Sequence, residues 1–335
     1  MRLMIGICTF RRDPSLRRLL DSLNEMALSR PSADEIRVLV VDNDPTPETH
    51  AICRQLTFES RLLIEYLPEA RRGLVCARNA LVEGALARDV DFLAMLDDDD
   101  VPDIDWLEHL VRVQRAQDAD IVAGNRRFPG RRPPSSGKNE AERAGKLGVK
   151  SVAGRTIPKA AATANLLVAA DFLRKLAAQG PVFDPRFADS GGEDEDFFVR
   201  AAALGARFAF APRSMVTQYH DPERFTVRGA YRRGFKTGCA RLNLVRRHEP
   251  GNEQGVVWRA LGKGLVVGFL LPLDLPNGGL PRFSYRLGKS LGTLSFWVTG
   301  RTPRYYGRDR GRMDPSASGA AARSRRPGTA GLRPG

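Results

Sequence analysis

Four consecutive aspartates, Asp97 to Asp100, follow the apolar run Phe92–Leu96. Adjacent carboxylates repel one another, so a bound cation would stabilise them. Mg²⁺ and Mn²⁺ prefer oxygen ligands and often bind one or two carboxylates together with a substrate phosphate. Because alternate residues of an extended segment point the same way, Asp97 and Asp99 could converge on one ion. The alternative is a solvated acidic turn before a helix near Asp103, but the position directly after a buried strand favours the metal site.

A second acidic group follows two glycines. Gly191 and Gly192 precede the run Glu193–Asp196. The glycines would bring the chain tightly into a helix, and the acids would fill its first turn. Acids at that place complement the helix dipole, yet a carboxylate held there could also act as a general base. The residues alone leave both interpretations open.

Three smaller features carry the same ambiguity. Asp42-Asn43-Asp44 follows the apolar run Ile36–Val41 and could form a turn or hydrogen-bond a nucleotide base or ribose. Arg78 could bind a diphosphate through its forked donors, although an exposed helical arginine is the commoner case. His220, beside Asp221, could ligate a metal, although a lone histidine is more often structural.

Strand and helix signals alternate along the first hundred residues. The predicted strands are Leu3–Cys8, Ile36–Val41, Leu62–Tyr66 and Phe92–Leu96, and the predicted helices are Ser15–Leu28, Glu48–Leu56 and Leu74–Ala87. This order predicts an α/β fold with a mostly parallel sheet flanked by helices. Ligands of such sheets bind beyond the carboxyl ends of the strands. We therefore expect Thr9–Arg12, Asp42–Asp44 and Asp97–Asp100 to lie along one rim.

The rest of the chain divides by composition. Further strands are expected at Thr163–Val168 and Ser214–Gln218, and further helices at Asp171–Ala178 and Glu193–Leu204, after a long loop at 126–159. We predict an α/β domain over 1–222, a basic helical region over 223–308, and a basic tail over 309–335. The tail is rich in Gly, Ser, Ala, Arg and Pro, a composition typical of disorder.

Composition limits the class of protein. The chain has 335 residues and a formal net charge of +14, half of which lies in residues 301–335. The four cysteines form no CxxC pair, so a disulfide framework is not expected and a reducing compartment is. Neither a signal peptide nor an apolar run of about 18 residues is present. These features predict a cytoplasmic protein without a spanning helix.

Two other functional classes fit parts of the sequence. A basic nucleic-acid-binding protein would suit the charge, but no such motif is present, and specific nucleic-acid binding is not expected. A sugar nucleotidyltransferase would carry a glycine-rich phosphate loop after the first strand, where this chain has Thr9–Arg12. The GxGxxG and GxxxxGK[ST] motifs are also missing there.

The order of the motifs resembles that of family 2 glycosyltransferases, which have the GT-A fold, a Rossmann-like nucleotide-binding architecture. The resemblance spans about residues 2–240. Its motifs are Ile7–Arg12, Val41–Asp44, Ala77–Asn79, Leu96–Pro102 and Gly192–Asp194. Cys8–Arg12, together with Asp42–Pro45 and Phe183–Asp184, is most similar to bacterial enzymes that build exopolysaccharides of the succinoglycan type.

This resemblance implies roles for individual residues. The implied donor-binding residues are Thr9, Phe10, Arg11, Asp42, Asn43, Arg78, Asp97 and Asp98. Asp97 and Asp99 match the DxD pair, with Asp99 as the direct ligand of Mn²⁺ or Mg²⁺. Asp194 matches the catalytic base, Glu193 beside it would position the acceptor, and Asn165 belongs to a segment that lines the acceptor side.

One departure concerns the metal site. Many relatives complete it with a histidine or glutamate in the strand after the base helix. In this chain Gln218 aligns with that position, and His220 lies two residues beyond. His220 is chemically the better ligand, and the alignment leaves both residues open.

The resemblance also implies an activity. An inverting glycosyltransferase would move a sugar from a nucleotide-diphosphate-sugar donor to a hydroxyl of a lipid-linked saccharide acceptor in polysaccharide synthesis. The stretches Val256–Leu273 and Phe283–Val298 carry Trp258 and Trp297 among basic residues. Such helices suit an anionic membrane surface, although packing on the catalytic domain would explain them equally. We expect peripheral association with the inner face of the cell membrane.

Overall fold

The computed structural model describes residues 1–29, 35–59, 62–129, 149–152, 155–158, 162–220, 222–274 and 279–302. Asp221, most of the predicted loop at 126–159 and the predicted tail at 309–335 lie outside these ranges. Residues Met1–Pro303 form one compact unit. The predicted boundary at 222 falls just before the first C-terminal helix and stays a prediction.

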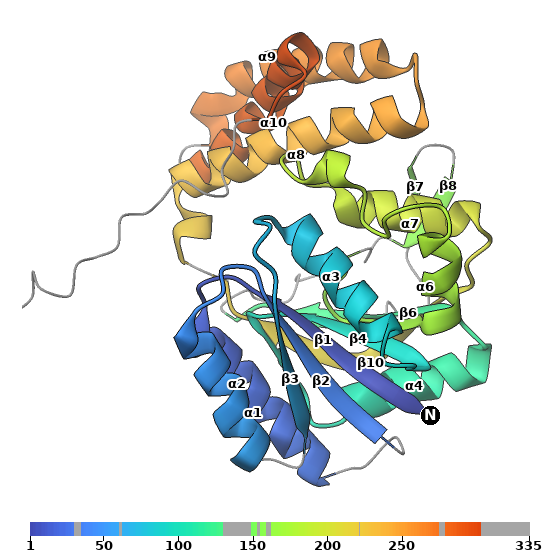
Figure 1. The fold of residues 1–335 in the computed structure, drawn as a ribbon. Coiled ribbons are helices and arrows are strands. Elements are labelled where there is room, and N and C mark those ends of the chain that lie inside the picture. Colours follow the sequence, from blue (N-terminus) through green and yellow to red (C-terminus); the bar gives the residue numbers. More distant parts are fainter. Residues whose placement is uncertain are drawn as a thin grey trace, which may run out of the picture. The chain divides into compact units, whose positions relative to one another are not determined.

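Strands and helices alternate along the first part of the chain, as the apolar periodicity predicts (Figure 1). The strands are β1 (Arg2–Thr9), β2 (Glu35–Asp42), β3 (Leu63–Pro68), β4 (Phe92–Asp97), β5 (Asp100–Pro102), β6 (Ile121–Arg127), β7 (Val149–Val152), β8 (Arg155–Pro158), β9 (Leu166–Ala169) and β10 (Phe208–Gln218). The helices are α1 (Asp13–Ser29), α2 (Pro47–Glu59), α3 (Leu74–Leu86), α4 (Trp106–Gln117), α6 (Ala170–Ala177), α7 (Glu193–Ala203), α8 (Val227–His248), α9 (Glu253–Asp274) and α10 (Leu280–Thr299), with short 3₁₀ turns η1 (Pro185–Phe187) and η2 (Pro222–Phe225).

Eight strands form one sheet in the order β3-β2-β1-β4-β9-β6-β10-β5. Strands β3, β2, β1 and β4 are parallel neighbours, and β6 is parallel to β10. Strand β9 runs antiparallel between β4 and β6, and β5 runs antiparallel along β10. The predicted α/β fold with a mostly parallel sheet is confirmed. The antiparallel strands were not predicted.

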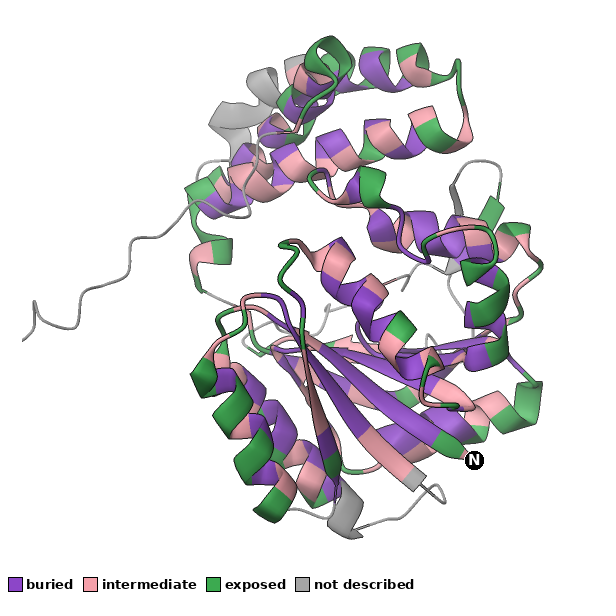
Figure 2. Ribbon diagram, viewed as in Figure 1, coloured by how far each residue is buried: buried purple, intermediate pink, exposed green. Residues whose placement is uncertain are grey.

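Helices cover both faces of this sheet because successive side chains of a strand point to opposite faces. In β1, Met4 joins a buried cluster that includes residues of α3, α6 and α7. Its neighbours Leu3 and Ile5 join a second cluster with α1, α2 and α4. Figure 2 shows the central strands as the most continuously buried part of the sheet. This two-sided core holds the carboxyl ends of the strands in a fixed arrangement.

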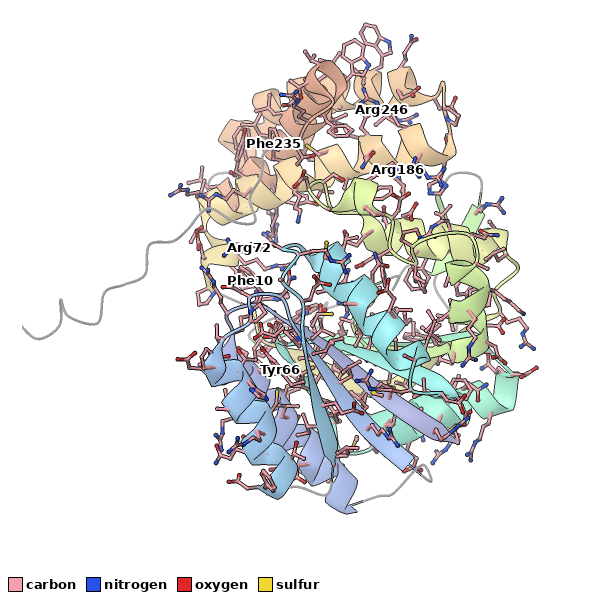
Figure 3. All side chains as sticks on the ribbon, viewed as in Figure 1. Phe10, Tyr66, Arg72, Arg186, Phe235 and Arg246 are labelled. Carbon is pink, nitrogen blue, oxygen red and sulfur yellow. The ribbon has the colours of Figure 1, made fainter. Side chains whose placement is uncertain are left out.

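The C-terminal helices α8, α9 and α10 have a small core of their own around Phe235 and Cys239 (Figure 3). Helices α8 and α10 approach closely at glycines. A Cβ added at Gly234 or Gly238 of α8, or at Gly292 of α10, would lie 2.0 to 2.1 Å from a backbone oxygen of the other helix. Larger side chains at these three positions would therefore force α8 and α10 apart. Among the described helices, none is long and apolar enough to cross a membrane.

Two predicted element boundaries need correction. The strand expected from Thr163 begins only at Leu166, because Asn165 adopts a left-handed backbone with φ 58°. The loop expected from Arg126 starts later, because β6 continues to Arg127 beside β10. Its last part contains the short antiparallel pair β7–β8.

Candidate active site

The acidic rim lies where parallel strands end. Thr9 at the end of β1 pairs with Asp42 of β2, and Cys8 pairs with Asp97 of β4. The prediction that the three segments share one rim is thus confirmed. The chemistry they can perform depends on what each side chain contacts.

The carboxylates of the rim bind different partners. Asp98, which is buried, accepts hydrogen bonds from the Thr9 hydroxyl at 3.0 Å and from Arg12 at 2.9 Å. Arg12 also reaches Asp99 at 3.3 Å. Burial raises the pKa of Asp98 to about 6, although the charge of Arg12 opposes the shift. Arg12 ends the motif Ile7–Arg12 but was not among the predicted site residues.

Asp97 and Asp99 do not share a partner. Asp97 lies 3.6 Å from Arg78, whereas Asp99 contacts Arg12, Gln218 and His220. In the described part of the chain, no three His, Cys, Asp or Glu side chains are grouped to hold a metal ion. The metal site that Asp97 and Asp99 were expected to share is therefore not preformed.

Both Gln218 and His220 reach Asp99. The Gln218 amide donates to Asp99 Oδ1 at 3.1 Å, while His220 Nδ1 lies 4.0 Å from Asp99 Oδ2. Strand β5 explains this approach, because it pairs Asp100 with Gln218. Within the described residues, His220 Nδ1 is buried and has no hydrogen-bond partner. Burial and the charge of Arg224 lower the pKa of His220 to about 4, which keeps the ring neutral at pH 7.

The second acidic group lies against Arg78 of α3. The Arg78 guanidinium is 2.7 Å from Glu193 and 2.5 Å from Asp194, in addition to its contact with Asp97. Burial opposes the charge of Arg78, but the three carboxylates together raise its pKa. The sequence suggested that Arg78 contacts the donor. In the structure it is the buried partner of acids from two motifs.

The glycines before α7 determine where its acids lie. Gly191 and Gly192 have φ values of 70° and 95°, which side chains rarely tolerate. The turn places Asp194 Oδ1 within 3.0 Å of the Thr163 hydroxyl as well as beside Arg78. Burial and the nearby charge of Asp194 raise the pKa of Glu193, although Arg78 opposes the shift. The sequence predicted Thr163 as the start of a strand and not as a site residue.

The predicted base and ribose pocket is built from residues that also bind one another. The fully buried Asp42 accepts hydrogen bonds from the backbone of Asp44 at 3.1 Å and from the Tyr66 hydroxyl at 3.0 Å. The Asn43 amide donates to the Arg71 carbonyl at 2.8 Å and accepts from the Gly73 N–H at 2.7 Å. Asp42 and Asn43 therefore shape the rim.

Phe10 and Arg11 lie at the outer part of the rim. The Arg11 guanidinium is 5.3 Å from the centre of the Phe10 ring and also binds Asp44. Arg72 reaches the same Asp44 at 3.3 Å, and Figure 3 shows Phe10 and Arg72 along one edge of the sheet. An aromatic ring with two arginines suits a nucleotide base and its phosphates.

Asn165 does not lie at an exposed surface. It is 1% exposed. Its amide donates to the backbone oxygens of Asn125 at 2.7 Å and Ser214 at 3.0 Å, and accepts from the Trp106 ring at 2.6 Å. These bonds join β6, β10 and α4. Asn165 thus holds the fold together, and the expected acceptor contact has no support from its position.

Comparisons with known proteins agree with this architecture. Residues 4–165 match the family model described as Glycosyl transferase family 2. The chain is 30% identical over 266 residues to the succinoglycan biosynthesis protein ExoM of Rhizobium meliloti (strain 1021). The aligned residues make up 79% of this chain and 81% of that protein.

Solved structures share the fold at low sequence identity. The mannosyltransferase PcManGT from Pyrobaculum calidifontis, in complex with GDP-Man and Mn²⁺, has a TM-score of 0.57 at 17% identity and covers 89% of this chain and 88% of its own. TarS 1–349 from S. aureus, in complex with UDP, has a TM-score of 0.50 at 15% identity. The match covers 90% of this chain and 92% of the TarS chain.

The curled sheet flanked by helices is the GT-A fold of glycosyltransferases. The chain belongs to glycosyltransferase family 2. The nucleotidyltransferase and nucleic-acid-binding alternatives are therefore set aside.

Proposed function

We propose that this glycosyltransferase moves a sugar from a nucleoside-diphosphate sugar to a hydroxyl of a lipid-linked saccharide, with inversion, in exopolysaccharide synthesis. The succinoglycan relative supports the pathway, and the GDP-Man and UDP complexes of the fold neighbours support the donor class. The contacts of Arg78 carry the proposal. Arg78 joins Asp97 on the donor rim to Asp194 at the start of α7, so the two halves of the reaction meet at one side chain.

Asp99 and His220 fit a divalent ion such as Mn²⁺ or Mg²⁺. The buried His220 Nδ1, which makes no hydrogen bond to the described residues, lies 4.0 Å from an Asp99 oxygen. Such ions bind one or two protein groups when substrate phosphates supply other ligands, so a preformed three-residue group is not required. When bound, the ion would neutralise charge that develops on the departing diphosphate.

The contacts of Asp194 support a role as the general base. Its Oδ1 is held by Arg78 and Thr163, while its Oδ2 accepts no hydrogen bond from the described residues and the side chain is 28% exposed. A carboxylate fixed through one oxygen can present the other to an acceptor hydroxyl and take its proton. Glu193 lies beside it to hold the acceptor. Attack opposite the departing diphosphate inverts the anomeric carbon.

Donor binding tests the first half of this proposal. We expect one nucleoside diphosphate among UDP, GDP and dTDP to raise the melting temperature of the protein with Mn²⁺, and to lose this effect in EDTA. Shifts that are equal with and without Mn²⁺ would contradict the metal site. Nuclear magnetic resonance of the product then tests the stereochemistry, because a retained anomeric configuration would contradict direct displacement.

We also propose that α9 and α10 rest on an anionic membrane surface. Trp258 of α9 is 70% exposed, and Trp297 and Val298 of α10 are 47% and 76% exposed, next to basic residues. Tryptophan and basic side chains suit the head-group region. The protein should float with vesicles of phosphatidylglycerol at low salt and be released at high salt. Trp258→Ala with Trp297→Ala should weaken flotation, and equal flotation of this variant would contradict the proposal.

A further inference from the structure

A groove of about 900 Å³ lies among the C-terminal helices and the start of α7. Its walls come from α8, α9 and α10, and Gly192 and Glu195 close one end. None of the aspartates of the donor rim lines it. The groove is therefore separate from the residues expected to bind the donor, yet it adjoins the turn that carries Asp194.

Positive charge surrounds this groove. Among the described residues, its lining contains one carboxylate, Glu195, and five basic side chains. The basic residues are Arg241 from α8, Arg259 and Lys263 from α9, and Arg286 and Lys289 from α10. Arg259 and Lys263 lie four residues apart, so they share one face of α9. Cations from three helices converging on one groove favour a ligand with several negative charges.

Most of these cations are not used by the fold. Within the described part of the chain, Arg241, Arg259, Lys263 and Lys289 make no ion pair, and all four are exposed. Many other arginines of the molecule do have acidic partners, as Arg207 has with Asp120 at 3.1 Å. Exposed cations that make no ion pair within the described residues are available to bind an anion.

The groove also has an apolar side. Val256 and Ala260 of α9 line it and are buried, and the same helix exposes Trp258 and Leu261. Apolar lining residues among basic ones suit a molecule that joins a charged group to a hydrocarbon chain.

Close contacts join the helices that form the walls of the groove. Glycine contacts lock α8 against α10, as at Gly238, where an added Cβ would lie 2.1 Å from the Lys289 carbonyl. Helix α8 is also tied to α7, because His248 binds the buried Asp196 at 2.8 Å. Asp196 lies two residues after Asp194. The groove and the candidate base are thus parts of one connected arrangement.

We propose that this groove binds the diphosphate of a lipid diphosphate-linked acceptor, with the start of the lipid chain on Val256 and Ala260. The inference rests on the proposed function and adds the chemical group by which the acceptor is recognised. Binding of the diphosphate beside Gly192 would bring the attached sugar toward Asp194. The basic cluster would then select acceptors by their diphosphate link.

Farnesyl diphosphate is a suitable probe, measured by calorimetry on the full chain in EDTA to suppress metal-dependent binding at the donor rim. The wild type should bind farnesyl diphosphate and not farnesol. The double variant Arg259→Gln/Lys263→Gln should bind it at least about a hundred-fold more weakly, since each of the two charged hydrogen bonds contributes about 1.5–3 kcal/mol and 1.4 kcal/mol is a factor of ten. Arg115→Gln, an exposed arginine of α4 without an ion pair among the described residues, is the matched control.

Two further measurements separate the possible failures. The Mn²⁺-dependent shift with a nucleoside diphosphate should be the same in the double variant and the wild type, and its absence from the wild type would overturn the proposed function. If that shift is present but farnesyl diphosphate does not bind, or binds the double variant equally well, this inference alone is wrong. If the double variant loses flotation with phosphatidylglycerol vesicles and keeps farnesyl diphosphate binding, the cluster recognises membrane head groups and the inference is also overturned.

Discussion

Two arginines contact the carboxylates of Asp97, Asp98 and Asp99, and they differ in burial. The Arg78 side chain is 5% exposed and contacts Glu193, Asp194 and Asp97. The Arg12 side chain is 49% exposed and contacts Asp98 and Asp99. Both compensate carboxylates that would otherwise repel one another, but only Arg78 does so away from water.

This difference separates a permanent contact from an exchangeable one. A buried ion pair is costly to break, because the remaining charge is left without solvent. A half-exposed arginine can be replaced by water, by a metal ion or by a phosphate at little cost. We therefore infer that Arg78 fixes the base side of the site, whereas the contacts of Arg12 change when metal and donor bind.

The largest expected effect is on turnover. Asp194→Asn keeps the shape of the side chain and can still accept from Arg78 and Thr163, but it cannot take a proton. We expect transfer to fall by roughly 10²–10⁴-fold, with the Mn²⁺-dependent nucleotide shift unchanged. Initial rates with saturating donor measure this. Normal turnover in Asp194→Asn, together with loss in Glu193→Gln, would assign the base to Glu193.

Loss of Arg78 should have the next largest effect, on stability. Arg78→Met leaves the carboxylates of Glu193 and Asp194 beside one another without their cation. We expect the free energy of unfolding to fall by about 3–5 kcal/mol, measured by urea denaturation at pH 7. A loss below about 1 kcal/mol would show that Arg78 is not the permanent contact that its burial indicates.

Arg12→Met is the matched variant on the exposed side. We expect its unfolding free energy to change by about 1 kcal/mol or less, because Asp98 can take up a proton once the arginine is gone. We also expect activity to fall, because we infer that the contacts of Arg12 change when metal and donor bind. Urea denaturation in parallel with Arg78→Met gives the comparison directly, and equal losses in the two variants would remove the distinction between them.

The smallest effect concerns Asp184, a buried acid whose arginine partners Arg186 and Arg247 are more exposed. Burial alone would raise the pKa of Asp184, but hydrogen bonds from Arg186 lower it below its ordinary value of 3.8. Its contribution to stability is thus present above pH 4 and is lost as the pH falls through the folded-state pKa. Asp184→Asn should be less stable than the wild type by about 1 kcal/mol at pH 7.

That difference should begin to shrink as the pH falls below about 4, toward the lowered pKa at which the wild-type carboxyl takes up its proton. Melting temperatures of the two proteins measured from pH 7 to pH 3 test this. A difference that is constant over the range would mean that the amide perturbs packing rather than charge.

The sequence by itself determined the fold class and the composition of the acidic rim. Apolar runs with helical or extended periodicity are local signals, so β1 to β4 and their helices could be predicted within a few residues. The rim followed because Thr9, Asp42 and Asp97 each end a strand, and parallel strands end at one edge. The glycines before α7 likewise marked the turn that presents Asp194.

Only the tertiary structure decided which of these residues work together. Arg78 and Asp194 are 116 residues apart, and no local pattern pairs them. The same holds for Gln218 and His220 at Asp99, which depend on the short strand β5. It also holds for Asn165, because a polar side chain gives no sign by itself that it is buried. Ion pairs and buried amides are chosen by packing between distant segments, because the cost of an unpartnered polar group arises only after the core has excluded water.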